Sequence, residues 1–136
     1  MKSVQDIRVI QLIDSLEPGG AERMAITIAN TFGNELPFSG LVVTRLEGSL
    51  KDTINSKVNY LFLKKKKALD FSALLRLRKF VKNNKVSVVH AHGSSYFFAV
   101  LLKFTIPSIK IFWHDHFGNR VEKSKANLPI KIASYF

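Results

Sequence analysis

The sequence of 136 residues contains no cysteine, which excludes a disulfide framework and any metal site built from thiolates. It also lacks an apolar run long enough to span a membrane, because Lys103, Pro107 and Lys110 interrupt the longest candidate, residues 96–113. The first residues have neither the apolar core nor the small-residue cleavage site of a signal peptide. We therefore expect a cytoplasmic protein.

Acidic residues are scarce, since 10 Asp and Glu stand against 21 Lys and Arg, for a net charge of +11. Such a charge attracts phosphorylated ligands, anionic membranes and nucleic acids. No nucleic-acid-binding motif accompanies it, so we expect no nucleic-acid partner. The charge is densest in Lys64, Lys65, Lys66 and Lys67. This block predicts either a solvated face or a basic patch on the inner face of the plasma membrane.

The pattern that is most clearly present is a strand, a turn and a helix in residues 8–32. The β-branched apolar run 8–13 predicts a strand buried on both faces, and Pro18, Gly19 and Gly20 then require a turn. Apolar residues at three- and four-residue steps predict a helix packed on the sheet, namely Ala21, Met24, Ala25, Ile28, Ala29 and Phe32. The glycines stand at the helix N-terminus, which favours phosphate, although a plain strand-to-helix turn gives the same pattern.

Strand and helix patterns alternate along the rest of the chain. Further strands are predicted at residues 38–44, 58–63, 86–90 and 110–114. Further helices are predicted at 49–54 with Ser49 as cap, at 71–83 with Asp70 as cap, at 94–104 opened by Ser94 or Ser95, and at 128–136. The helix at 71–83 is expected to turn inward Phe71, Leu74, Leu77 and Val81. We predict one α/β domain over residues 1–136, with a Rossmann-like, doubly wound parallel sheet.

Polar clusters follow three of the predicted strands, at residues 14–23, 90–95 and 114–120. All 4 histidines of the chain lie in the last two clusters. Ligands bind at the carboxyl ends of parallel strands, so we expect a site there. The pairs His90/His92 and His114/His116 fit metal binding with oxygen ligands from Asp14 and Asp115, hydrogen bonds between loops, or the binding of sugar hydroxyls or an acceptor.

Three segments resemble glycosyltransferase family 4, the retaining, nucleotide-sugar-dependent enzymes of the GT-B fold. Residues 18–23, Pro-Gly-Gly-Ala-Glu-Arg, look like the opening of that family. Residues 88–93, Val-Val-His-Ala-His-Gly, and 111–115, Ile-Phe-Trp-His-Asp, are similar to two later segments of it. Ser87 stands where the family often has an acidic residue. The resemblance covers nearly the whole chain and implies the N-terminal half of a GT-B glycosyltransferase.

The resemblance also implies roles for individual residues. His114 takes the catalytic position that faces the acceptor and the transferred sugar, while Gly19 and Gly20 form the loop at the donor diphosphate and the acceptor. His90, His92 and Asp115 are implied to bind acceptor or sugar. Glu22 and Arg23 match the motif but suit the start of the helix. Lys64–Lys67 correspond loosely to a membrane-surface basic patch. No metal and no cofactor is implied, since a nucleoside-diphosphate sugar is the donor substrate.

A GT-B enzyme has a second half, which clamps the nucleotide sugar with a Lys/Arg pair and a Glu-x7-Glu element. Neither is found in this sequence, so the resemblance predicts an incomplete N-terminal, acceptor-side domain that is inactive alone. With the nucleotide-sugar-binding domain, it is expected to act as a hexosyltransferase on a saccharide or lipid-linked acceptor in cell-envelope polysaccharide synthesis. Two alternatives stay open: a metal-dependent hydrolase that uses the His-x-His pairs, and a non-catalytic domain that binds a membrane or a partner.

Overall fold

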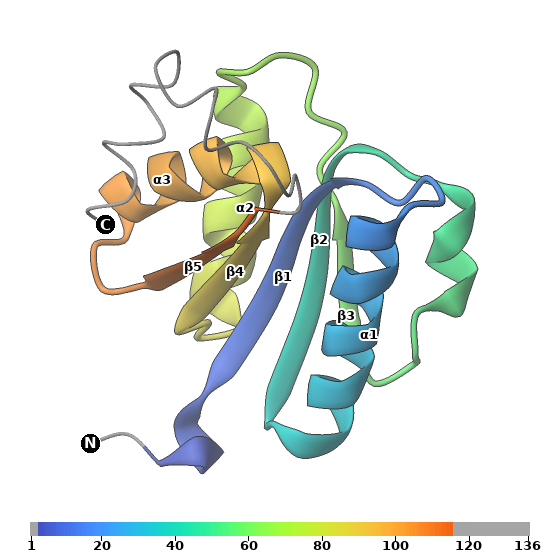
Figure 1. Cartoon of the computed structure of the whole chain (residues 1–136). Helices are drawn as coiled ribbons and strands as arrows, with labels where there is room; N and C mark the ends of the chain where they lie inside the picture. Colours follow the sequence, from blue (N-terminus) through green and yellow to red (C-terminus); the bar gives the residue numbers. More distant parts are fainter. Residues whose placement is uncertain (1–2, 116–136) are drawn as a thin grey trace.

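A computed structural model describes residues 3–115 of the chain as a five-stranded parallel sheet between two layers of helices (Figure 1). The strand order is β3-β2-β1-β4-β5, and every neighbouring pair is parallel. The strands are β1 (Arg8–Ser15), β2 (Phe38–Leu46), β3 (Asn59–Phe62), β4 (Val88–His92) and β5 (Lys110–His114). This architecture confirms the predicted Rossmann-like, doubly wound α/β sheet.

β1 lies at the centre of the sheet and is buried on both faces. Leu12 pairs in register with Val42 of β2 and with Ala91 of β4. The side chains from Val9 to Ile13 are all buried, as an apolar β-branched run predicts. The strand continues through Ser15, so Asp14 belongs to it and not to the following turn. That extension carries Asp14 to the carboxyl edge of the sheet.

The helices cover the two faces unequally (Figure 1). α1 (Gly20–Glu35) packs on one face against β1 and β2, where Ile13, Ala25 and Ala29 belong to one buried cluster. α2 (Phe71–Asn83) and α3 (Tyr96–Thr105) share a larger cluster on the other face. Short 3-10 helices are η1 (Val4–Asp6), η2 (Ser49–Thr53) and η3 (Gly93–Ser95). No helix in residues 3–115 is long and apolar enough to cross a membrane.

The start of α2 follows directly from its cap. The Asp70 carboxylate accepts hydrogen bonds from the backbone N–H of Ala73 at 3.1 Å and of Lys66 at 3.0 Å. The first bond satisfies one of the helix donors that have no partner within the helix, which confirms Asp70 as the N-cap. The second bond fixes the loop before the helix, so one side chain positions both segments.

Two predicted inward positions are wrong. Met24 of α1 is 42% exposed and Phe71 of α2 is 68% exposed. Ile26 and Ala73 are buried in their helices instead. Periodicity identifies an apolar stripe, but the width of the sheet beneath the helix decides which edge of that stripe is covered. Phe71 is the first residue of α2, whereas Met24 is the fifth residue of α1.

Other predicted boundaries also change. Gly48, and not Ser49, caps η2. The fourth strand runs from Val88 to His92, so both of its histidines lie within it. Ser95 is the N-cap of α3, which begins at Tyr96, so the predicted opening at Ser94 or Ser95 holds, and η3 lies directly before it. The predicted helix at 128–136 lies outside the described residues.

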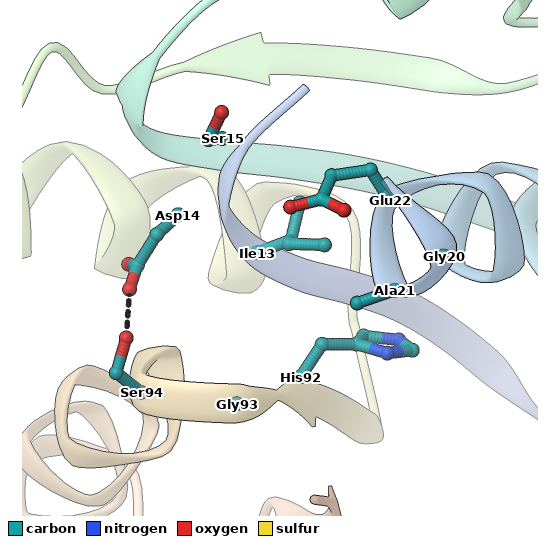
Figure 2. Close-up of a pocket in the computed structure, with 9 residues that line it drawn as sticks. All are labelled: Ile13, Asp14, Ser15, Gly20, Ala21, Glu22, His92, Gly93 and Ser94. Atoms are coloured by element: carbon teal, nitrogen blue, oxygen red, sulfur yellow. Dashed lines mark hydrogen bonds between the residues drawn. The ribbon is translucent and has the colours of Figure 1, made fainter. Parts of the chain in front are cut away.

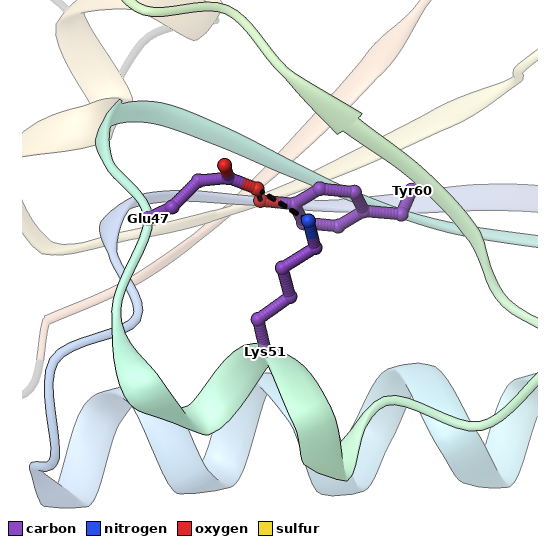
Figure 3. A network of polar contacts seen from close by, with 3 residues as sticks. All are labelled: Glu47, Lys51 and Tyr60. Carbon is purple, nitrogen blue, oxygen red and sulfur yellow. Dashed lines mark hydrogen bonds and ion pairs between the residues drawn. The ribbon is translucent and has the colours of Figure 1, made fainter.

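A polar network fixes the segment after β2 (Figure 3). The Tyr60 hydroxyl of β3 donates to the Glu47 carboxylate at 2.5 Å, and Lys51 of η2 lies 3.0 Å from the same oxygen. The backbone of this segment also holds the loop after β1, because Leu50 N–H donates to Leu16 at 3.1 Å. These contacts therefore hold the loop that leads into α1 in place.

Candidate functional site

A pocket of about 370 Å³ opens at the carboxyl edge of the sheet, between β1 and β4 (Figure 2). The sheet order runs outward from β1 in both directions, so this edge is the topological switch point where α/β sheets bind ligands. The residues that line the pocket come from β1, the start of α1 and the β4–η3 junction: Ile13, Asp14, Ser15, Gly20, Ala21, Glu22, His92, Gly93 and Ser94.

The N-terminus of α1 forms one wall of the pocket. Gly19 is its N-cap, in extended conformation, and no side chain caps the helix. An added Cβ at Gly20 would meet no other atom within 4 Å, so the backbone there is open to the pocket. First-turn N–H groups and the positive end of the helix dipole make this wall suitable for an anion. Gly20 therefore lies where the sequence predicts a phosphate-facing glycine.

Two carboxylates also line the pocket, Asp14 on the wall opposite α1 and Glu22 on the α1 wall, close to Gly19. Asp14 accepts hydrogen bonds from the Thr44 hydroxyl of β2 at 2.5 Å and from the Ser94 hydroxyl of η3 (Figure 2). Glu22 also lines the pocket, from the first turn of α1. Carboxylates accept hydrogen bonds from sugar hydroxyls, whereas the helix N-terminus offers donors. Sequence reasoning considered Asp14 only as a metal ligand, and its position at the end of a buried strand was the signal.

Three histidines gather beside the pocket. His90 and His92 are alternate residues of β4 and therefore point to one face, and His114 of β5 pairs in register with His92. The ring centroids lie 4.3 Å apart for His90 and His92, 5.8 Å for His90 and His114, and 5.9 Å for His92 and His114. His92 is buried, whereas the other two are half-buried. Parallel strand pairing thus unites two predicted motifs.

A glutamine holds the buried member of this histidine cluster. Gln11 of β1 accepts a hydrogen bond at its Oε1 from the Nε2–H of His92, at 2.7 Å. Because an amide oxygen can only accept, His92 carries its proton on Nε2. Gln11 is fully buried, and its Nε2 has no hydrogen-bond partner in the described part of the chain. The signal in the sequence was a polar residue within an apolar strand.

The turn from β4 into η3 is tightly fastened. The Ser95 hydroxyl donates to the backbone oxygen of Leu12 at 2.7 Å and accepts from the His92 N–H at 3.1 Å. Trp113 of β5 donates its indole N–H to the Gly93 oxygen at 3.0 Å. Gly93 has a φ of 59°, a left-handed conformation that glycine adopts without strain. Hydrogen bonds therefore connect the β4–η3 turn to both β1 and β5.

The predicted basic patch lies in the loop between β3 and α2, and none of its residues lines the pocket. Lys64, Lys66 and Lys67 are exposed, but Lys65 is half-buried, with its Nζ 4.7 Å from the centre of the Phe98 ring. Burial lowers the pKa of Lys65, and Asp14 opposes that effect through its negative charge. Three of the four lysines therefore form an exposed charged surface.

The other predicted site residues group around these features. Gly20 and His92 line the pocket, while His90 and His114 lie beside His92. Asp115 directly follows β5, is half-buried and does not line the pocket. His116 lies outside the described residues.

The chain matches a known family model. The family model described as Glycosyltransferase Family 4 matches residues 18–134 of the chain. No curated protein matches it. The matched residues begin at the turn into α1 and include both strands of the histidine cluster.

Proposed function

The chain belongs to glycosyltransferase family 4, and from that premise we propose that the pocket between β1 and β4 is a sugar-transfer site. The family implies a sugar donor and an acceptor. We propose that the donor is a nucleoside-diphosphate sugar, that a hexosyl group is moved, and that its anomeric configuration is retained. The observation that carries the proposal is the meeting of an uncapped helix N-terminus with carboxylates in one pocket at the switch point.

In this proposal the backbone N–H groups and the carboxylates of the pocket hold different parts of the substrates. The N–H groups at Gly20 and Ala21 bind the donor diphosphate and stabilise the charge that develops as it leaves. Asp14 and Glu22 accept hydrogen bonds from sugar hydroxyls. His114, with His90, His92 and Asp115 around it, orients the transferred sugar and the acceptor. No protein nucleophile is needed, because the leaving diphosphate assists the acceptor hydroxyl on the same face of the sugar.

Transfer then depends on positioning more than on acid–base chemistry. The Lys/Arg pair and the Glu-x7-Glu element that clamp the nucleotide in the family have no counterpart in this sequence. We propose that a second α/β half supplies them and that residues 1–136 serve as the acceptor-side domain, inactive alone. No cofactor enters the proposed transfer step.

The test of this role is His114→Ala, assayed in the protein as its gene encodes it, with a panel of nucleoside-diphosphate sugars. Turnover should fall by roughly 100-fold or more, because the sugar and acceptor lose their alignment, while nucleotide affinity stays nearly unchanged. Phe112→Ala is the matched control, because Phe112 lies on the same strand and the same face of the sheet and is exposed. An equal loss of turnover and nucleotide affinity would contradict the role.

We further propose that the acceptor is lipid-linked and that the domain lies on an anionic membrane, as the basic patch suggests. Exposed apolar side chains adjoin that patch in sequence: Leu69 at 54% exposure, Phe71 at 68% and Leu75 at 63%. Phe71 and Leu75 are four residues apart on α2 and so share one face of it. Apolar side chains beside lysines fit a surface that enters the headgroup region of a bilayer.

Cosedimentation with phosphatidylserine-containing vesicles tests this surface. Changing Lys64, Lys66 and Lys67 to Gln should weaken binding by at least about 100-fold at low salt, because each near-surface charge contributes about 1 kcal/mol. Phe71→Ser should weaken it as well, whereas Phe104→Ser, an exposed aromatic of α3, should not. Equal binding of neutral vesicles, or equal effects of the two serine variants, would refute the proposal.

A further inference from the structure

We propose that His90, His92 and His114 form a binding site for a divalent transition-metal ion such as Zn²⁺. The proposed transfer step needs no such ion, so this site is additional to it. One ligand nitrogen from each histidine lies within 4.8 Å of the others. A tetrahedral zinc ion with Zn–N distances of about 2.0–2.1 Å places its nitrogens roughly 3.3 Å apart. The nitrogens therefore have to move closer together when the ion binds.

The backbone supplies the arrangement that such a site needs. His90 and His92 alternate on β4, and His114 is the register partner of His92 on β5. All three Cα atoms therefore belong to paired strands of the sheet, and none belongs to a loop. A site on paired strands keeps its ligands in place before the metal arrives, which favours binding.

Gln11 supplies the outer support that metal-binding histidines usually have. A ligating imidazole typically donates its other N–H to a fixed acceptor, which sets the tautomer and the ring orientation. His92 donates its Nε2–H to Gln11 at 2.7 Å, so Nδ1 is the nitrogen that can face an ion. The metal would replace the contact that this nitrogen makes with the backbone of η3 at Ser95.

The donor set also selects the type of ion. Three neutral imidazoles suit Zn²⁺, Co²⁺, Ni²⁺ or Cu²⁺, whereas Mg²⁺ and Ca²⁺ prefer oxygen ligands. Three protein ligands leave the fourth tetrahedral position open to water or another ligand. Because His114 is shared, a bound ion would withdraw it from the sugar, so the metal is expected to inhibit transfer. Only that consequence rests on the proposed function.

Metal binding can be measured without any sugar substrate. The purified, chelator-treated chain is titrated with Co²⁺, and the visible d–d absorption of tetrahedral cobalt is followed. We expect one equivalent to bind, Zn²⁺ to displace it and excess Mg²⁺ to leave it in place. Gln11→Leu removes an outer-shell partner and should weaken Co²⁺ binding by roughly 10–100-fold. His90→Ala and His114→Ala each remove a ligand and should weaken it by more than that.

Phe112→Ala is the control here too, since it changes the same face of β5 without removing a nitrogen. The folding of each variant is checked by circular dichroism. Folded wild-type protein that binds no stoichiometric Co²⁺ would overturn the proposal, as would His90→Ala or His114→Ala variants that bind as tightly as wild type. A transferase that fails its own assay while it binds Co²⁺ would refute only the proposed function.

Discussion

Local contacts decide the protonation of individual side chains, and Tyr60, which does not line the pocket, is the clearest case (Figure 3). Burial raises its pKa well above the ordinary value of a tyrosine, and the hydrogen bond to Glu47 and the charge of that carboxylate add to the effect. The same hydrogen bond lowers the pKa of Glu47, with Lys51 contributing second. The folded chain therefore favours a neutral Tyr60 and a charged Glu47.

Tyr60→Phe removes this pair of opposite shifts. A raised tyrosine pKa gives stability that is present below its unfolded value near 10 and lost as the pH rises through the folded value. A lowered carboxyl pKa gives stability that is lost as the pH falls through the folded value. Wild type should thus melt at a higher temperature than Tyr60→Phe near neutral pH. The difference in melting temperature should shrink at both low and high pH. A melting-temperature difference that is constant with pH would contradict this.

Gln11 shows why some of the site cannot be predicted at the residue scale. A polar residue in an apolar strand was visible in the sequence, but its partner His92 is 81 positions away. Only the parallel pairing of β1 with β4 brings them together. The same holds for His114, which meets His92 through the register of β5.

At the scale of elements, the β4–η3 turn contributes as much of the pocket lining as the start of α1 does. Its backbone lines the pocket, its first residue is left-handed, and hydrogen bonds from β5 and to β1 hold it. Such a turn is stable only while its buried polar groups stay paired.

Ser95→Ala tests that statement. It leaves the Leu12 oxygen and the His92 N–H without their hydroxyl partner in a buried place, which costs about 1–3 kcal/mol per unpaired group. Urea unfolding measures the loss. Ser94→Ala is the control, because Ser94 is exposed and should change stability far less. Equal losses in the two variants would contradict the account.

The start of α2 depends on one carboxylate in a similar way. The backbone N–H groups of Lys66 and Ala73 lower the pKa of Asp70. Its contribution to stability is therefore present above the unfolded pKa and is lost as the pH falls through the folded one. At neutral pH, Asp70→Ala should melt at a lower temperature than wild type. In acid the two melting temperatures should become equal, as followed by circular dichroism. Asp52→Ala, which removes an acidic side chain from the first turn of η2 but no cap, is the control and should lower the melting temperature at neutral pH less than Asp70→Ala does.

For the whole molecule, the alternation of strand and helix patterns was enough to predict the fold. The bounds of α2 and β5 match the prediction because a capping aspartate and a proline-bounded apolar run mark them. Met24 and Phe71 were misplaced because burial depends on what covers a helix, which periodicity does not contain. The topology predicts that the polar clusters gather at the carboxyl edge of the sheet. The contacts between their side chains depend on the register of the strands, which the sequence does not show.

The proposed function depends above all on binding of the donor diphosphate in the pocket between β1 and β4. The most direct measurement is an amide NMR titration of the chain with inorganic pyrophosphate, in wild type and in Gly20→Leu. Gly20 has open space beyond its Cα, so the leucine variant should fold normally while its side chain occupies the anion position.

We expect shifts at Gly20, Ala21 and Gly93 in wild type. In Gly20→Leu the affinity should be at least tenfold weaker, a loss of about 1.4 kcal/mol, because the leucine side chain keeps the anion from its backbone N–H donors. Shifts confined to Lys64–Lys67, or an affinity that Gly20→Leu leaves unchanged, would show that pyrophosphate binds the basic surface and would contradict the claim.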